Sequence, residues 1–287
     1  MGDNALKVNK LTKKYRDFIL DEATFNIPKG TIVGLVGKNG SGKSTSIGLI
    51  LGLIKKDSGD IQILGKQNQE INFETRNKIG VVFDGNNFPD YLTPKKLNKL
   101  LKNIYSSWNE NKYFSYLENL SLPFDKKIKE FSKGMKTKLQ ITAAISHDPE
   151  LLILDEPTSG LDPVVRDDIL DMLLDFIQNE KNSVLISSHI TSDLEKIADY
   201  IVFIHDGKIM FEKQKDELRY KYGVIKCETE QFYKIDPKDI IAYRKQDYEW
   251  QILVSDRFEA IEKYPNTIID SASIDDIMLL YIKGKQK

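Results

Sequence analysis

The chain has 287 residues, of which 42 are Lys or Arg and 43 are Asp or Glu, so its formal net charge is −1. Hydrophobic residues make up 40% and charged residues 30%, a composition typical of globular proteins. The near balance of charge argues against nucleic acid as a partner, and no apolar run approaches the roughly 18 residues that cross a bilayer. The polar N-terminus predicts no secretory signal, and a single cysteine, Cys227, excludes an internal disulfide framework.

Short apolar and β-branched runs alternate with helical patterns over the first part of the chain. Strands are expected over residues 5–11, 18–27, 31–36, 60–65 and 79–83, with a helix over 42–53. A helical pattern with apolar residues three and four apart covers residues 94–120. A further helix, with Ser132 as its N-cap, is expected to end near residue 146.

The same alternation continues to about residue 220. Strands are expected over 151–154 and 183–187, and Pro163 opens a helix as a first-turn proline. A hairpin of residues 199–204 and 208–212 is expected to turn at Asp206-Gly207. This alternation predicts an α/β domain with a mostly parallel sheet.

After about residue 222 the pattern changes. Strands are expected over 224–235 and 250–254, and helices over 258–264 and 274–282. This part is predicted to be a small α+β appendage, so the expected domains are residues 1–221 and 222–287.

The strand at 31–36 runs into a glycine-rich loop and then into a helix. Gly37, Gly42, Lys43 and Ser44 fit the phosphate-binding pattern G-x-x-x-x-G-K-[ST]. The glycines allow backbone N–H groups to converge on a phosphate at a helix N-terminus, Lys43 is expected to reach the β- and γ-phosphates, and Ser44 to bind Mg2+. The other residues expected to line this loop are Asn39, Gly40, Ser41 and Thr45.

Two carboxylates follow the buried strand at 151–154. Because ligands bind outside the carboxyl ends of parallel strands, Asp155 is expected to hold Mg2+ and Glu156 to polarise an attacking water. Tyr15 lies in a predicted turn ahead of the phosphate loop, where it could stack on adenine. From the residue alone, a partly exposed surface tyrosine is the simpler interpretation.

In this order, the motifs resemble those of the ATP-binding subunits of ABC transporters, over about residues 5–220. The resemblance implies a mostly parallel core sheet, an antiparallel β subdomain and a helical subdomain. It implies ATP and Mg2+ as cofactors, with Lys43, Glu156 and His189 as catalytic residues. His189 matches the switch histidine, which contacts the γ-phosphate, and Tyr15 matches the aromatic residue that stacks on adenine.

The run Phe131–Met135 resembles the signature of this family, and Ser159–Asp162 resembles its D-loop. The resemblance implies that two ATPase subunits meet head to tail and trap ATP between one phosphate loop and the opposing signature. Both a homodimer and a heterodimer fit this arrangement. The residues expected at the nucleotide of the other subunit are Ser132, Gly134 and Met135, with Asp162 also lining the site.

The chain departs from the commonest family pattern at two places. Lys133 and Met135 stand where Gly and Gln are usual, a form that resembles a bacterial subgroup that exports drugs, antibiotics or peptides through separate membrane subunits. Exporters of phenol-soluble modulin peptides belong near this subgroup. Asp84 stands where Gln is usual, and as a hard oxygen ligand it is still expected to bind Mg2+.

The resemblance also implies partners and a location. An integral membrane permease is expected to contact residues 85–101, which places the chain at the cytoplasmic face of the membrane. A soluble ABC ATPase acting on ribosomes or nucleic acid is the alternative, but such proteins usually carry two ATPase units or a long insertion. A P-loop kinase would not explain the signature or His189, and no residue indicates the transported substrate.

Overall fold

The computed structural model describes residues 3–85 and 87–286. The chain forms two compact units, Met1–Phe211 and Glu212–Lys287, and the boundary along the chain falls within the strand β10 (Lys208–Gln214). This division does not test the predicted domains, residues 1–221 and 222–287, which stay a prediction. Asn86, within the segment expected to contact a permease, and the chain ends that the predicted domains include lie outside the described residues.

A six-stranded sheet forms the centre of the first unit, with the strand order β10-β9-β3-β8-β7-β6. The pairs β3–β8, β3–β9, β7–β8 and β6–β7 are parallel, as predicted. Every residue of β3, β7 and β8 is buried, which explains why these strands are apolar runs without alternation. The strands are β3 (Ile32–Val36), β6 (Ile79–Val82), β7 (Leu151–Asp155), β8 (Ser183–Ser188), β9 (Tyr200–His205) and β10 (Lys208–Gln214).

A separate antiparallel sheet has the strand order β2-β1-β4-β5. Its strands are β1 (Asn4–Lys14), β2 (Ile19–Pro28), β4 (Ser58–Ile63) and β5 (Lys66–Gln67). Apolar residues of this sheet, of α1 (Lys43–Ile50) and of the parallel strands form one buried core. A single 3-10 turn at residues 68–70 and the short helix α2 (Phe73–Arg76), neither of them predicted, lead back to the parallel sheet.

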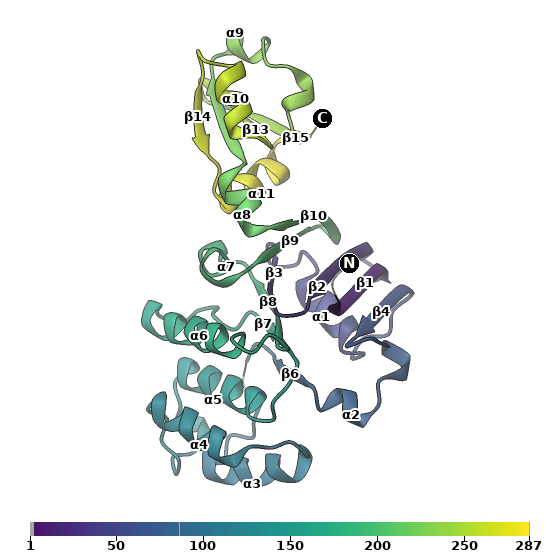
Figure 1. Ribbon diagram of the computed structural model, residues 1–287, viewed down its shortest axis with the longest axis vertical. Coiled ribbons are helices and arrows are strands. Elements are labelled where there is room, and N and C mark those ends of the chain that lie inside the picture. Colours follow the sequence, from purple (N-terminus) through teal and green to yellow (C-terminus); the bar gives the residue numbers. More distant parts are fainter. Residues whose placement is uncertain (1–2, 86, 287) are drawn as a thin grey trace. The chain divides into compact units, whose positions relative to one another are not determined.

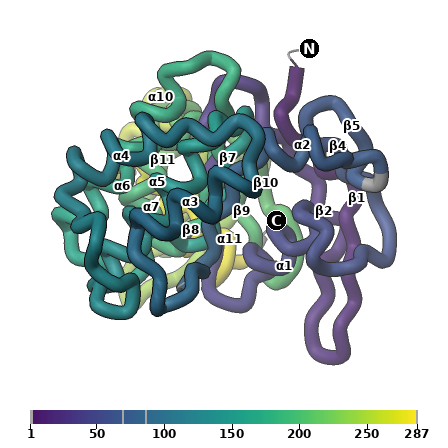
Figure 2. Tube along the Cα trace, turned by 90° about the horizontal axis from the view of Figure 1, so that it is seen from below, coloured from purple at the N-terminus to yellow at the C-terminus, as the bar shows by residue number. Residues whose placement is uncertain are grey.

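The antiparallel strands and the helices α3 to α6 lie on opposite sides of the parallel sheet in both Figure 1 and Figure 2. The pattern predicted as helical over residues 94–120 forms two helices, because Tyr105 leaves helical geometry and Asn109 caps the second helix. A buried core that includes Leu97, Tyr113 and Leu139 joins α3, α4 and α5. The helices are α3 (Pro94–Ile104), α4 (Glu110–Asn119), α5 (Lys133–Ile145), α6 (Pro163–Phe176) and α7 (Thr191–Ile197), the last of them not predicted.

The second unit contains a five-stranded antiparallel sheet with the order β14-β11-β13-β12-β15. The strand predicted over 224–235 is wrong beyond Cys227, because Glu228 and Gln231 form a capping box that starts a helical turn. The strands are β11 (Gly223–Cys227), β12 (Ala242–Gln246), β13 (Glu249–Val254), β14 (Ile268–Ser271) and β15 (Lys285–Gln286). The helices are α8 (Lys215–Tyr220), α9 (Thr229–Phe232), α10 (Arg257–Lys263) and α11 (Ile274–Lys283).

Among the described residues, every helix falls short of the length and apolar character that a bilayer-spanning segment requires.

Candidate active site

The loop between β3 and α1 has the backbone that a phosphate cradle requires. Gly40 and Gly42 have φ values of 82° and 114°, which side chains other than glycine rarely adopt. At Gly37 a Cβ atom would lie 2.4 Å from the carbonyl oxygen of Ile204, so only glycine fits. The loop therefore turns tightly into the N-terminus of α1, where backbone N–H groups lack helical partners.

Lys43 lies inside this loop, with only 5% of its side chain exposed. Its Nζ donates to the carbonyl oxygen of Gly37 at 2.6 Å and to that of Lys38 at 3.2 Å. It also forms an ion pair with Oε1 of Glu156 at 3.0 Å. Because a buried cation is costly unless it is paired, the Glu156 carboxylate compensates the charge of Lys43.

Glu156 follows β7 in a left-handed backbone conformation, with a φ of 51°. The parallel pairing of β7 and β8 places Ser187 opposite Asp155. The Ser187 hydroxyl donates to Oδ1 of Asp155 at 2.6 Å and accepts from the backbone N–H of Glu156 at 3.0 Å. This one serine therefore fixes both acidic residues, and the strained φ of Glu156 turns its side chain toward Lys43.

His189 lies just after β8 and completes the cluster. Its Nδ1–H donates to Oε2 of Glu156 at 2.6 Å, so the two oxygens of one carboxylate bind Lys43 and His189. Three elements that are far apart in sequence converge here, as expected at the carboxyl edge of a parallel sheet. The arrangement holds a carboxylate beside the lysine of the glycine-rich loop, where the carboxylate can accept a proton from water.

The remaining loop residues present polar groups to the same region. Ser41 is buried and its hydroxyl has no hydrogen-bond partner among the residues that the structure describes, whereas Asn39, Gly40 and Ser44 are exposed and Thr45 is half-buried. An unpartnered buried hydroxyl carries a desolvation cost that an oxygen-rich ligand would relieve. These residues fit an anionic ligand such as a phosphate chain.

The donor set also fits Mg2+. Ser44 supplies an exposed hydroxyl, and Asp155 and Asp84 supply carboxylates that are buried and 61% exposed, respectively. Within residues 3–85 and 87–286, no group of three or more His, Cys, Asp or Glu side chains could hold a metal ion. Mg2+ typically takes only one or two protein carboxylates together with substrate phosphates, so few ligands from the chain suffice.

Tyr15 is 44% exposed, and its ring lies 6.4 Å from that of Phe18. The Phe18 ring in turn lies 3.0 Å from the position that a Cβ atom on Gly42 would take. One aromatic ring therefore connects Tyr15 with the phosphate loop. Phe18 and Ser187 are residues that the sequence analysis missed, and only the pairing of the strands could have identified Ser187.

Ser132 and Asp162 are helix caps in the structure. The Ser132 side chain accepts from the N–H of Met135 at 3.2 Å, which confirms the predicted N-cap of α5. The Asp162 side chain accepts from the N–H of Val165 at 3.1 Å at the start of α6. The two helix starts touch, because a Cβ atom on Gly134 would lie 2.7 Å from the Val165 side chain.

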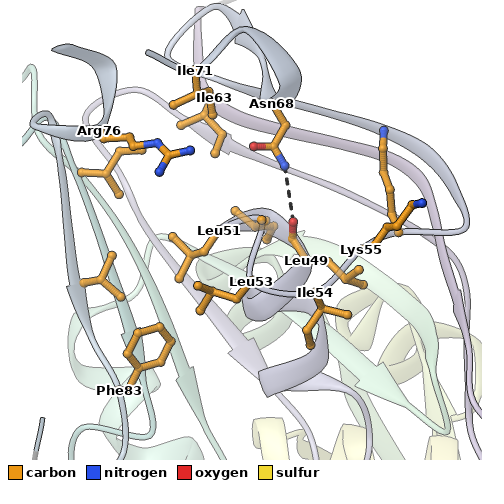
Figure 3. Close-up of a pocket in the computed structure, with 15 residues that line it drawn as sticks. Leu49, Leu51, Leu53, Ile54, Lys55, Ile63, Asn68, Ile71, Arg76 and Phe83 are labelled. Carbon is orange, nitrogen blue, oxygen red and sulfur yellow. Dashed lines mark hydrogen bonds between the residues drawn. The ribbon is translucent and has the colours of Figure 1, made fainter. Parts of the chain in front are cut away.

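A groove of about 950 Å3 opens between the end of α1, the antiparallel sheet and β6. Figure 3 shows its apolar lining, with the basic side chains of Arg76 and Lys55 at opposite sides of it and a hydrogen bond from Asn68 to the Leu49 carbonyl oxygen at 3.4 Å. Its apolar residues include Leu49, Leu51, Leu53, Ile54, Ile63, Ile71 and Phe83.

Comparison with known proteins identifies the family to which this chain belongs. The model of the ABC transporter family matches residues 20–159. A bacitracin transport ATP-binding protein of Bacillus licheniformis is 36% identical over 217 residues, which are 75% of this chain and 71% of that protein. A lantibiotic transport ATP-binding protein of Streptococcus pyogenes is 37% identical over 218 residues, which are 74% of this chain and 91% of that protein.

Solved structures with a similar fold come from the same family. The ATP-binding subunit of an ABC transporter superimposes with a TM-score of 0.68 at 29% identity, covering 75% of this chain and 92% of that structure. An ATP-binding cassette of an ABC transporter in its ADP conformation gives 0.63 at 25% identity, covering 74% and 91%. The chain therefore belongs to the ABC transporter family, as one of its ATP-binding subunits.

Proposed function

We propose that this chain hydrolyses ATP at the loop Gly37–Thr45, with Glu156 as the residue that orients the attacking water. The observation that carries this proposal is the position of Glu156, whose carboxylate binds Lys43 at 3.0 Å and His189 at 2.6 Å. The water attacks the γ-phosphorus, Glu156 accepts its proton, and ADP leaves.

Lys43 and the loop N–H groups neutralise and position the phosphate chain. In the present structure Lys43 is satisfied by two carbonyl oxygens and by Glu156. When ATP binds, Lys43 exchanges these partners for the β- and γ-phosphates, and Glu156 becomes available to water. Ser41 donates its unpartnered hydroxyl, and His189 approaches the γ-phosphate.

Ser44, Asp155 and Asp84 hold Mg2+, which neutralises phosphate charge when it is bound. Ser187 orients Asp155 through its 2.6 Å hydrogen bond and so supports this role from a distance. Tyr15 stacks on the adenine ring, with Phe18 as the ring behind it.

A second ATPase subunit completes the site. At the starts of α5 and α6, Ser132 and Asp162 are exposed, Met135 is half-buried and the backbone of Gly134 lies between them, and helix N-termini favour phosphate. These residues bind the ATP of the opposing subunit. ATP binding therefore favours the closed pair, because the closed state contacts the γ-phosphate from both sides.

The groove at α1 and β6 binds the membrane permease of this transporter. Leu53, in its lining, is 67% exposed, and the described residues of 85–101 are the second part of the proposed contact region. The lining and the basic residues Lys55 and Arg76 suit an apolar helix that also carries an acidic residue. The permease holds the chain at the cytoplasmic face of the membrane.

The transported substrate is an antibiotic or peptide, and the direction is export. The support is similarity to proteins named for bacitracin and lantibiotic transport. Nothing in the site favours a ribosome or nucleic acid as partner, and the net charge of −1 argues against it. Residues 1–221 form the ATPase domain, and residues 222–287 form an accessory domain.

Transport in vesicles tests this function. The chain is reconstituted with its membrane subunit, and uptake of a labelled peptide antibiotic is measured with ATP on the side of the chain. Transport should be lost in both Glu156→Gln and Leu53→Asp, but only Leu53→Asp should keep ATP turnover by the isolated chain. Tyr248→Asp, at an exposed position in the other unit, is the matched control and should transport normally.

Two results would contradict the proposal. Transport that persists in the Leu53→Asp variant would exclude the groove as the permease site. ATP-independent uptake, or a chain that binds no ATP, would exclude the function as a whole.

A further inference from the structure

Two ion pairs join the start of α5 to the segment that follows β6. Lys133 Nζ lies 4.0 Å from Oδ1 of Asp84, and Lys136 Nζ lies 3.8 Å from Oδ1 of Asp90. The first pair is exposed, with 53% of the Lys133 side chain and 61% of the Asp84 side chain accessible. Asp84 and Lys133 are the two charged residues that stand where the commonest family pattern has uncharged ones, and the structure pairs them.

A partly buried hydrogen bond joins the same two segments. The Gln140 side chain, on a residue only 4% exposed, donates to the carbonyl oxygen of Gly85 at 2.6 Å. Positions 133, 136 and 140 are spaced by three and four residues, so they lie on one face of α5. Three residues of that face therefore contact the segment that follows β6. The contact made by Asp84 is the one to the signature, through Lys133.

The first turns of α5 carry positive side chains that acidic residues of the helix itself do not balance. Lys133 and Lys136 occupy the first turns of the helix, and no acidic residue lies in its first turn. Cations are unfavourable at a helix N-terminus because the helix dipole is positive there. Asp84 and Asp90 bring negative charge to this end of α5 from another segment.

We propose that Lys133 is a positioning residue that holds the Asp84 carboxylate in the absence of nucleotide and competes with Mg2+ for it. This inference rests on the proposed function, in which Asp84 is a ligand of Mg2+. The Asp84 carboxylate can bind either Lys133 or Mg2+, so it links the metal site of a subunit to the signature of the same subunit. In the proposed dimer, that signature faces the nucleotide of the other subunit. The consequence is that removal of Lys133 strengthens Mg2+ binding, and that it does so through Asp84.

A double-mutant cycle measures this coupling. Lys133→Gln, Asp84→Asn and the double variant are made in a Glu156→Gln background, so that ATP is not consumed. Mg2+ is titrated at a fixed concentration of a fluorescent ATP analogue, and the apparent affinity for Mg2+ is read from nucleotide fluorescence. We expect Lys133→Gln to raise this affinity about two- to fivefold, the range that an exposed ion pair supplies, and to change nothing when Asp84→Asn is also present.

A matched control is available on the same helix. Lys136→Gln removes one positive charge a single turn further along, but its partner Asp90 is not a proposed ligand of Mg2+. The affinity for Mg2+ should stay within about 1.5-fold of the parent, since solvent and salt screen more distant charges. An equal rise in Lys136→Gln and Lys133→Gln would show a general charge effect and overturn the inference.

Amide hydrogen exchange gives a readout without metal or nucleotide. Both single variants should exchange faster over residues 83–90, and the double variant should add nothing further. A Lys133→Gln effect that is the same with and without Asp84 would overturn the inference while leaving the proposed function intact. If Asp84→Asn also leaves Mg2+ affinity unchanged while the analogue binds normally, the metal role of Asp84 in the proposed function is wrong as well.

Discussion

The ion pair between the start of α1 and the end of β7 and the ion pair between the start of α5 and the segment after β6 are held in different ways. Lys43 and Glu156 are 5% and 13% exposed and have several partners each, whereas Asp84 and Lys133 are more than half exposed. A buried charge that loses its partner costs several kcal/mol, whereas an exposed pair contributes about 0–1 kcal/mol. The buried cluster therefore suits the chemistry itself, and the exposed pair suits adjustment of the site.

The largest effect is expected at Glu156. Glu156→Gln removes the proton acceptor but keeps the size of the side chain, so ATP turnover should fall by about 10²- to 10⁴-fold while nucleotide binding persists. Turnover is measured as phosphate release, and binding with a fluorescent ATP analogue. Glu150→Gln lies one residue before the same strand, at its opposite end, and serves as the control that should keep turnover.

A buried histidine outside the site, His147, shows how burial of a titratable group affects the stability of the fold. His147 is 1% exposed and stacks on Tyr105 at 4.0 Å, and burial lowers its pKa from 6.5 to about 4. Because the unfolded chain binds the proton more readily, the stabilising contribution of His147 is complete above pH 6.5 and is lost between pH 6.5 and about 4. The loss should reach about 3 kcal/mol.

Denaturant unfolding of the wild type and of His147→Gln across this pH range measures that loss. The difference between their free energies of unfolding should shrink as the pH falls from 7 to 4. A His147→Gln curve that runs parallel to that of the wild type would contradict the buried neutral histidine.

The side chain of His189 is 39% exposed, a value between those of Glu156 and Lys133. His189→Ala removes one hydrogen bond to a charged group, so turnover should fall by about 10- to 100-fold, less than in Glu156→Gln. Steady-state phosphate release at saturating ATP measures this step. If the loss equals that of Glu156→Gln, exposure is a poor guide to the size of the effect.

Tyr15 is the exposed aromatic of the site. Tyr15→Ala should weaken ATP binding by about 1–3 kcal/mol, the range for stacking of a base on an aromatic ring, with little change in turnover at saturation. Tyr15→Phe keeps the ring and should bind like the wild type. Equal affinities of ATP and inorganic triphosphate for the wild type would show that no such stacking occurs.

The motifs of this chain predicted more of the site than of its surroundings. The glycine loop, the acidic pair at the end of β7 and the cap at Ser132 depend on local sequence, and the structure confirms their backbone setting. The role of Ser187 depends on which strands are neighbours, and the pair Asp84–Lys133 depends on tertiary packing. Periodicity alone carries neither kind of information.

The second unit shows the same limit for the fold. Residues 224–235 look like one β-prone run, but the capping box of Glu228 and Gln231 ends the strand after Cys227. The strand β14 lies at the edge of the sheet and β12 lies between β13 and β15. Both are short, and apart from the buried Ala242 their residues are exposed or half-buried without clear alternation. They are strands because β11 and β13 pair with them, which is a property of the whole sheet.

A crystal structure of the Glu156→Gln variant with Mg2+ and ATP tests the central claim most directly. The account predicts that Lys43 leaves the carbonyl oxygens of Gly37 and Lys38 and binds the β- and γ-phosphates, which lie within the loop Gly37–Thr45. It also predicts the adenine on Tyr15. A Lys43 side chain that keeps its present partners while ATP is bound elsewhere would contradict the account.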